Sequence, residues 1–275
     1  VILNVAEKPS GARSLAEVFA RTPGAVDRRA PPAPGAAQAF ACHNVRFPSV
    51  LRQGGDGPPG PDVAHTMITT SVRGHLASQD FGPRYGWQQC PPVALFDAPI
   101  ETTYREDMEP LRMMLKGRAQ ACGALILWLD CDREGEAIAD EVRTVCLEGN
   151  RSLRANVFRA KFSTVMPQEI NRALRTLGRV NEAWVQAVQA RSEHDLRVGA
   201  AFTRFQTLRL QRKFEGFRDR GVVSYGPCQF PTLGFVVERW ARIETFLPED
   251  FWTIDMSVSY THLRAHETRG NLVCR

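Results

Sequence analysis

Short apolar runs alternate with longer amphipathic segments over the first 160 residues. Residues 1–6 and 124–129 are short, almost continuously apolar runs, which is typical of strands buried on both faces. Residues 65–72 predict a third strand, and helical spacing follows at about 9–20 and 108–120. Strands that alternate with helices predict an α/β domain with a mainly parallel sheet and helices on both faces.

The pattern becomes mainly helical after about residue 160. Residues 166–176 and 180–214 have apolar positions near the 3.6-residue period, and Pro231 opens another helix to about residue 243. We therefore predict a first domain over 1–160 and a partial, mainly helical domain over 161–256. Residues 22–64 are rich in Pro, Gly and Ala, which predicts a flexible insertion in the first domain.

Three acidic residues follow the apolar run at 124–129 directly. In extended chain, Asp130 and Asp132 project to the same side, and Glu134 sits at the turn into the next helix. Hard carboxylate oxygens at the end of a buried strand suit Mg²⁺, which usually also meets phosphate oxygens. Acids can instead simply open a helix, where they complement its dipole. A helix cap needs only one acidic residue, and this segment has three. We therefore favour the metal-binding interpretation.

Glu7 stands at the end of the first apolar run, as Asp130 stands at the end of its own. The carboxyl ends of neighbouring parallel strands meet at one edge of a sheet, where ligands commonly bind. The sequence therefore predicts that the two carboxylates share a site.

Positive charge is concentrated in one part of the chain. The formal net charge is +5, while residues 151–220 hold fifteen Lys and Arg against six Asp and Glu. Cations beside an acidic, metal-binding edge are typical of a protein that handles a polyanion. A solvated helical face is the alternative, because charge runs are usually exposed.

Cysteine spacing and hydropathy restrict the class of protein. The seven cysteines form no C-x-x-C pair and no zinc-like spacing, which indicates reduced intracellular thiols. No apolar stretch approaches the roughly 20 residues that span a bilayer, and no signal peptide opens the chain. We expect a soluble intracellular protein without a membrane partner.

The motifs, taken in order, resemble a known family. A strand followed by Glu7-Lys8, and then Asp-x-Asp-x-Glu-Gly-Glu from Asp130, resembles the Toprim domain of topoisomerases, primases and some nucleases. Residues 71–76, 190–204 and 224–234 resemble the type IA DNA topoisomerases, and residues 197–211 are most similar to the eukaryotic topoisomerase III alpha group. The resemblance covers roughly residues 1–21 and 65–250.

The resemblance implies a fold, a reaction and a set of site residues. Type IA enzymes cut one DNA strand with a tyrosine, pass another strand through the break and reseal it, with Mg²⁺ and without ATP. Glu7 and Lys8 are implied as catalytic residues, and Asp130, Asp132 and Glu134 as Mg²⁺ ligands. The implied DNA contacts are His75, Arg133, Arg191, Asp195, Arg204, Ser224, Gly226 and Gln229.

Simpler interpretations of these contacts stay open. His75 can be a packed histidine in a turn, and Arg133 can pair with a neighbouring carboxylate. Arg191 and Asp195 are four residues apart on a predicted helix. An exposed ion pair at that spacing stabilises a helix by only about 0.2–0.5 kcal/mol.

The family's nucleophilic tyrosine is not expected in this chain. In the family it lies in a later segment, roughly aliphatic-Ser/Thr-Tyr-x-Arg, and Tyr225 instead occupies a variable position of the Ser-x-Gly-x-x-Gln element. We therefore interpret the chain as an amino-terminal fragment that is inactive alone, with residues 257–275 as a non-native tail.

The resemblance also suggests a cellular role. It implies relaxation of negative supercoils and resolution of recombination intermediates during DNA repair, in the nucleus, with mitochondria as a second location. Single-stranded DNA is the expected partner, RNA is left open, and a RecQ-type helicase and an OB-fold accessory subunit are expected by analogy. The alternatives are a Toprim nuclease or primase, or a fragment that only binds nucleic acid.

Overall fold

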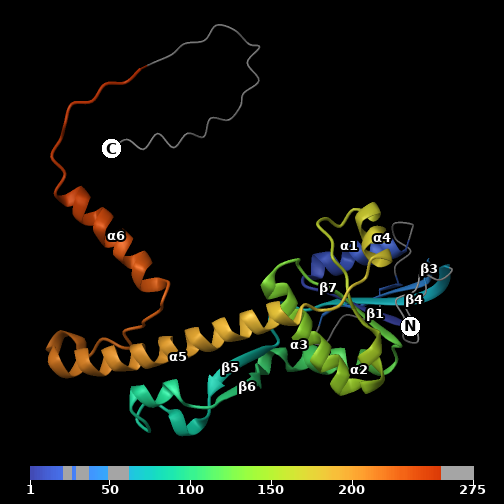
Figure 1. Ribbon diagram of the computed structural model, residues 1–275, viewed down its shortest axis with the longest axis horizontal. Helices are drawn as coiled ribbons and strands as arrows, with labels where there is room; N and C mark the ends of the chain where they lie inside the picture. The colour runs from blue at the N-terminus through green and yellow to red at the C-terminus, as the bar shows by residue number, and fades with distance from the viewer. Residues whose placement is uncertain (21–26, 29–36, 49–61, 255–275) are drawn as a thin grey trace. The chain divides into compact units, whose positions relative to one another are not determined.

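The computed structural model describes residues 1–20, 27–28, 37–48 and 62–254 (Figure 1). The chain divides into two compact units, residues 1–227 and residues 228–275.

A six-stranded sheet forms the centre of the first unit, in the order β2-β3-β4-β1-β7-β8. The strands are β2 (Asp27–Arg28), β3 (Phe40–Pro48), β4 (Asp62–Ser71), β1 (Ile2–Ala6), β7 (Ala124–Trp128) and β8 (Val157–Arg159). Strands β4, β1, β7 and β8 run parallel, whereas β2 and β3 form an antiparallel edge. The predicted strands at 1–6, 65–72 and 124–129 are thereby confirmed as β1, β4 and β7.

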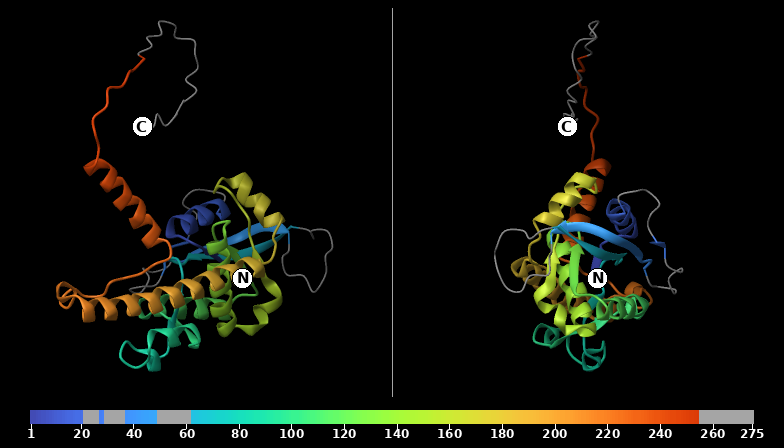
Figure 2. Two further views of the ribbon diagram at one scale, coloured as in Figure 1. Left: turned by 60° about the vertical axis from the view of Figure 1, so that its left-hand side comes forward. Right: turned by 90° about the vertical axis from the view of Figure 1, so that its right-hand side faces the viewer.

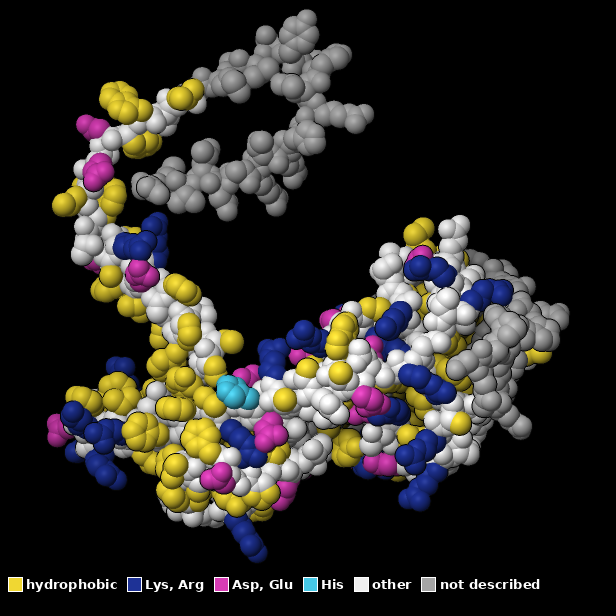
Figure 3. Space-filling view, in the orientation of Figure 1, with side chains coloured by type: hydrophobic (Ala, Val, Ile, Leu, Met, Phe, Trp, Pro, Cys, Tyr) yellow, Lys and Arg dark blue, Asp and Glu magenta, His cyan; other side chains and the backbone are white. Residues whose placement is uncertain are grey.

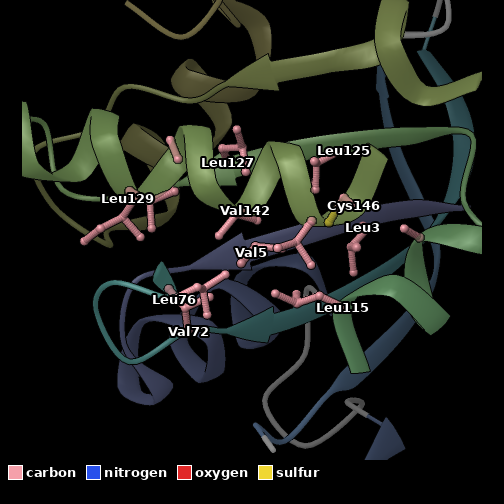
Figure 4. Close-up of a cluster of buried hydrophobic side chains, with 14 of the residues drawn as sticks. Leu3, Val5, Val72, Leu76, Leu115, Leu125, Leu127, Leu129, Val142 and Cys146 are labelled. Atoms are coloured by element: carbon pink, nitrogen blue, oxygen red, sulfur yellow. The ribbon is translucent and has the colours of Figure 1, made fainter. Parts of the chain in front are cut away.

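Helices cover both faces of this sheet, as the sequence pattern predicted (Figures 1 and 2). Helices α1 (Pro9–Phe19) and α4 (Pro167–Arg175) pack on one face, and α2 (Glu109–Gln120) and α3 (Arg133–Gly149) pack on the other. Side chains alternate across a strand, so Leu125 and Leu127 join the α2 and α3 layer while Ile126 and Trp128 join the α1 and α4 layer. Figure 4 shows the first of these two cores, around Leu125 and Leu127.

The prediction of a flexible insertion over 22–64 needs correction. Residues 40–48 form β3, which pairs along β4, and Phe40 and Cys42 are buried in the core beside α1. The Pro and Gly content around β3 concealed its short alternating pattern. Within 22–64, the structure describes β2, residues 37–48 and the start of β4. The other residues of this stretch lie outside the described residues, as does the predicted tail at 257–275.

A long helix and a small second sheet complete the first unit. Strands β5 (Ala77–Phe81) and β6 (Ile100–Tyr104) pair antiparallel, and the segment between them contains the short 3-10 helices η1 (Pro83–Tyr85) and η2 (Pro92–Phe96). Helix α5 (Glu182–Lys213) packs against α3, η2 and β5, and Asn181 caps its start by accepting a hydrogen bond from the Trp184 amide. Short helical turns also occur at η3 (Glu106–Met108), η4 (Arg151–Asn156) and η5 (Glu215–Phe217).

The described part of the second unit is a single helix followed by extended chain. Helix α6 (Gln229–Glu244) confirms the helix predicted after Pro231, and residues 246–254 have no regular structure. Among the described helices of both units, none is long and apolar enough to cross a membrane.

Candidate functional site

The ends of two neighbouring strands bring Glu7, Lys8 and Asp130 together. Strands β1 and β7 are parallel neighbours with Ala6 opposite Trp128, so the residues that follow them meet at one edge. The Asp130 amide donates to Glu7 Oε2 at 3.0 Å, and Lys8 Nζ lies 3.1 Å from Asp130 Oδ2 and 3.7 Å from Glu7 Oε1. The hydrogen bond and the charge of Asp130 raise the pKa of Lys8, which stays a cation. The edge thus holds an exposed ammonium group between two carboxylates.

The acidic turn leads directly into α3. Asp132 is the N-cap of this helix, and its Oδ1 accepts a hydrogen bond from the Gly135 amide at 2.7 Å. A Cβ at Gly135 would lie 2.1 Å from the main-chain oxygen of Asp130, so the turn requires glycine there. Arg133 is exposed and makes no ion pair with a described residue, which leaves its guanidinium group accessible.

Each predicted metal ligand has a different partner in this structure. Asp130 contacts Lys8, Asp132 caps α3, and Glu134 contacts His75 and Arg191. Among the described residues, no three His, Cys, Asp or Glu side chains stand together closely enough to hold a metal ion. The hard oxygen donors fit Mg²⁺ in their chemistry. In this structure, the carboxylates of Asp130 and Glu134 contact basic side chains, whereas the carboxylate of Asp132 accepts a backbone amide.

His75 connects the turn after β4 to α3. Gly74 has a φ of 84°, in the left-handed region that glycine tolerates, and His75 follows it. His75 Nδ1 lies 2.7 Å from Glu141 Oε1, and Nε2 lies 3.2 Å from Glu134 Oε2. The hydrogen bond that the His75 ring donates to Glu141 is the main cause that raises the pKa of His75.

Glu141 was not predicted from the sequence. Its Oε2 accepts hydrogen bonds from the amides of Leu76 at 2.7 Å and Ala77 at 3.2 Å, so it fixes the segment that carries His75. Glu134 and Glu141 are seven residues apart on α3, about two helical turns. That spacing is the signal that could have placed both carboxylates on one face.

A buried ion pair between Arg159 and Glu136 supports the acidic turn from the interior of the protein. Arg159 is fully buried and Glu136 is 2% exposed, with Nε and Oε1 2.9 Å apart. Arg159 Nη2 also donates to the main-chain oxygen of Asp130 at 2.7 Å. Glu136 Oε2 accepts from the amide of Asn181 at 2.9 Å, which ties the turn to the start of α5. Sequence reasoning missed this pair, because Glu136 belongs to an acidic run that otherwise faces solvent.

Helix α5 brings a second set of predicted residues to the same edge. Arg191 Nη1 lies 3.5 Å from Glu134 Oε1, and its Nε lies 3.7 Å from Asp195 Oδ2. His194 Nδ1 lies 3.6 Å from the other oxygen of Asp195. All three α5 side chains are exposed. The Arg191–Asp195 ion pair, which the sequence left open as an alternative to DNA contact, is present, and it joins the acidic turn.

Arg204 is not part of this exposed edge. Its side chain is largely buried, donates to the main-chain oxygens of Tyr85 and Gly86, and lies over the Trp87 ring at 5.6 Å. The implied direct DNA contact therefore has to be replaced by a structural role, in which Arg204 holds the segment after β5 against α5. Buried guanidinium groups need such acceptors because unpaired charge in the interior is costly.

Ser224 and Gly226 lie along the second half of α5. The Tyr225 amide donates to Thr203 Oγ1 at 2.8 Å, and the Tyr225 ring packs on Phe202 with centroids 5.0 Å apart. This places Ser224, which is exposed, and Gly226 near Thr203, in the second half of the helix. Gln229 belongs to the second unit, at the start of α6.

Comparison with known proteins places these features in a wider context. Residues 2–165 match the family model described as Toprim domain, and residues 179–271 match the model described as DNA topoisomerase. The DNA topoisomerase 3 of Dictyostelium discoideum is 39% identical over 298 residues, covering 99% of this chain and 33% of that protein. The DNA topoisomerase 3-alpha of Homo sapiens is 46% identical over 193 residues, covering 70% of this chain and 19% of that protein.

The fold also resembles a solved structure. Topoisomerase I from Thermotoga maritima aligns with a TM-score of 0.51 at 21% identity, covering 90% of this chain and 31% of that one. The chain thus spans about a third or less of the relatives that it matches.

Proposed function

This chain belongs to the type IA DNA topoisomerase family, and we propose that it forms the Toprim and DNA-gripping part of an enzyme of the topoisomerase III kind. The proposed reaction is cleavage of one DNA strand, passage of a second strand and religation, without ATP. The observation that carries this proposal is the single edge at which Lys8 contacts Asp130 while Glu134 contacts Arg191 of α5.

Lys8 and Glu7 are the proposed catalytic residues at the scissile phosphate. The exposed ammonium group of Lys8 would stabilise negative charge that develops on the phosphate oxygens. Glu7 lies within 3.7 Å of Lys8 and would hold or release the proton of the 3′ oxygen. The hydrogen bond from the Asp130 amide fixes the Glu7 carboxylate for this purpose.

Asp130, Asp132 and Glu134 are the residues that would hold Mg²⁺. When bound, the ion would supply positive charge that positions the 3′ end for religation. Binding would require Asp130 and Glu134 to exchange their contacts with Lys8, His75 and Arg191. The ammonium group of Lys8 and the guanidinium group of Arg191 would then be available to the DNA backbone.

Exposed residues of α5 and of the neighbouring loops are proposed to grip single-stranded DNA. Arg191 and Arg133 would contact phosphates, which give affinity without base specificity. His75, Asp195, Ser224 and Gly226 are the remaining proposed contacts of the first unit, and Arg204 contributes by holding the loop beside α5. Gln229, in the second unit, is proposed as a DNA contact from the family resemblance alone.

Tyr225 is not the proposed nucleophile. Its ring packs on Phe202, and its backbone is held by Thr203, beside α5 rather than among the Glu7, Lys8 and Asp130 side chains. We expect this chain to bind DNA without forming a covalent adduct.

The wider role follows from the family and stays a proposal. It comprises resolution of recombination intermediates in DNA repair, action in the nucleus or mitochondria, and assembly with a RecQ-type helicase and an OB-fold subunit. RNA is a second candidate substrate for the same phosphate-binding edge.

Binding of fluorescent oligothymidine to the 275-residue chain tests the proposal. We expect affinity that falls steeply with salt, and a further loss for Arg191→Ala but not for Arg172→Ala, an exposed arginine paired with Glu169. Salt-independent binding would contradict the proposed grip. Hydrolysis of the oligonucleotide by the chain would instead favour a Toprim nuclease.

A further inference from the structure

One face of α5 carries cations and aromatic rings well beyond Arg191. Arg191 and Arg209 are eighteen residues apart, which is five turns at 3.6 residues per turn, so both side chains leave the helix in the same direction. Their separation along the axis is about 27 Å at 1.5 Å per residue. Phe202 and Phe205 lie between them, within about 40° of the same direction, and are 44% and 53% exposed.

A groove lies at the far end of this face. It has a volume of about 460 Å³ and is lined by Pro92, Phe205, Leu208, Arg209, Arg212 and Lys213. We call it the distal groove. Figure 3 shows hydrophobic and basic side chains gathered together toward the end of α5.

The charge of the distal groove is not neutralised within the described residues. Arg209 and Arg212 have no acidic partner there, and Lys213 contacts the Phe214 ring at 5.5 Å. The nearest acid along the chain, Glu215, contacts Arg218 instead. Three cations beside exposed rings are complementary to a flexible anion that also has flat apolar surfaces.

We propose that the distal groove binds a segment of the same nucleic-acid strand that Arg191 holds, with a base stacked on Phe205 and phosphates on Arg209 and Arg212. This inference rests on the proposed function and extends it to a strand path of about 27 Å along α5. Single-stranded nucleic acid has both chemistries, because its backbone is anionic and its bases stack on aromatic rings without regard to sequence. The path also passes Phe202 and Tyr225, which already pack on each other.

The face of α5 that leads to the distal groove is continuous with the edge that carries Lys8 and Asp130. This continuity favours a nucleic acid over an acidic protein segment as the occupant. Arg191, Phe202, Phe205 and Arg209 follow one line on one helix, and that line begins at the phosphate-handling edge. A strand held at Arg191 would reach the distal groove by following the helix past Phe202, whose ring also packs on Phe96 of η2 and on Tyr225.

Fluorescence anisotropy of the 275-residue chain with oligothymidines of about 6 and about 20 nucleotides tests this path. We expect the longer strand to bind more tightly, and Arg209→Ala with Arg212→Ala to abolish that gain, with a loss of about tenfold. The salt slope for the longer strand should become shallower by about 1.4, since each phosphate contact on a single strand contributes about 0.7. Phe205→Ala should also weaken the longer strand, by about tenfold, through lost stacking.

The matched control is Arg151→Ala with Arg154→Ala, which removes two exposed arginines from η4, before β8, at the opposite end of the strands. If the groove variant behaves as this control, or if the longer strand binds no better than the shorter one, the inference is overturned. A polyglutamate of similar charge that displaces the longer strand as well as unlabelled oligothymidine would overturn it too. Loss of binding in Arg191→Ala alone, with unchanged groove variants, refutes the distal groove and leaves the proposed function standing; absence of any binding refutes both.

Discussion

Arg159 holds the main-chain oxygen of Asp130 from inside the protein, with its Nη2 donating across 2.7 Å. The same guanidinium group pairs with Glu136 and donates to the main-chain oxygen of Ala160. A single buried side chain therefore connects β7, α3 and β8 beneath the acidic turn. The geometry of the exposed carboxylates therefore depends on a fully buried group.

Removal of this buried cation should be costly to stability. Arg159→Ala leaves the Glu136 carboxylate buried without its charge partner, and we expect a loss of about 3–5 kcal/mol in the free energy of unfolding. Urea denaturation followed by circular dichroism measures it. Arg172→Ala, which breaks an exposed pair with Glu169, should cost less than about 1 kcal/mol. Equal losses in the two variants would contradict the supporting role of Arg159.

Two glycines in neighbouring helices should respond in opposite ways to alanine. Gly135→Ala places a Cβ 2.1 Å from the Asp130 oxygen, so the turn has to shift and the protein loses stability. Gly117→Ala in α2 meets no atom within 4 Å and should raise the free energy of unfolding by about 0.5–1 kcal/mol. Thermal unfolding of both variants measures the difference. A Gly135→Ala protein as stable as the wild type would show that the turn is not as tight as described.

The His75 ring should titrate above its ordinary range. Glu141 stabilises the imidazolium form, so the pKa is raised in the folded protein. The resulting stabilisation is present at pH values below the unfolded pKa and is lost as the pH rises through the raised folded pKa. NMR titration without divalent cations measures it, and Glu141→Gln should lower the pKa while Glu169→Gln should not. A His75 pKa unaffected by Glu141→Gln would contradict the assigned cause.

Much of the fold could be predicted from the sequence, and so could the meeting of Glu7 and Asp130 at one edge of the sheet. The strand ends at Glu7 and Asp130 were predictable because parallel neighbours place their carboxyl ends side by side, whatever the sequence between them. Strand β3 was not, since its pairing with β4 depends on a long-range register that Pro and Gly around it conceal. A local hydrophobic pattern predicts the type of element, but it does not predict which strands pair with one another.

The partners of the arginines were the least predictable feature. Arg159 meets Glu136 across 23 positions, and Arg204 meets Tyr85 and Gly86 across more than one hundred. Nothing in the spacing of Arg204 distinguishes a group that faces DNA from one that binds buried carbonyl oxygens. Only the packing of the segment after β5 against α5 decides between them.

Magnesium binding should depend on the acidic turn. Asp130→Asn combined with Asp132→Asn removes two hard anionic donors, and we expect Mg²⁺ affinity to fall by at least about tenfold. Amide chemical shifts of residues 130–135 during Mg²⁺ titration measure it. Asp107→Asn, which removes an exposed carboxylate paired with Arg105, is the control. Mg²⁺ that binds both variants as tightly as the wild type would remove these residues from the proposed ligand set.

The central claim is that Lys8 and the carboxylates around it act on DNA phosphate, and a chimeric enzyme tests it most directly. This chain would replace the matching segment of the Dictyostelium discoideum DNA topoisomerase 3, and relaxation of negatively supercoiled DNA would be followed with Mg²⁺ and without ATP. We predict that the chimera relaxes DNA and that Lys8→Ala slows it by about 100-fold, while Arg172→Ala leaves it unchanged. Relaxation by the Lys8→Ala chimera at the unmodified rate would contradict the account.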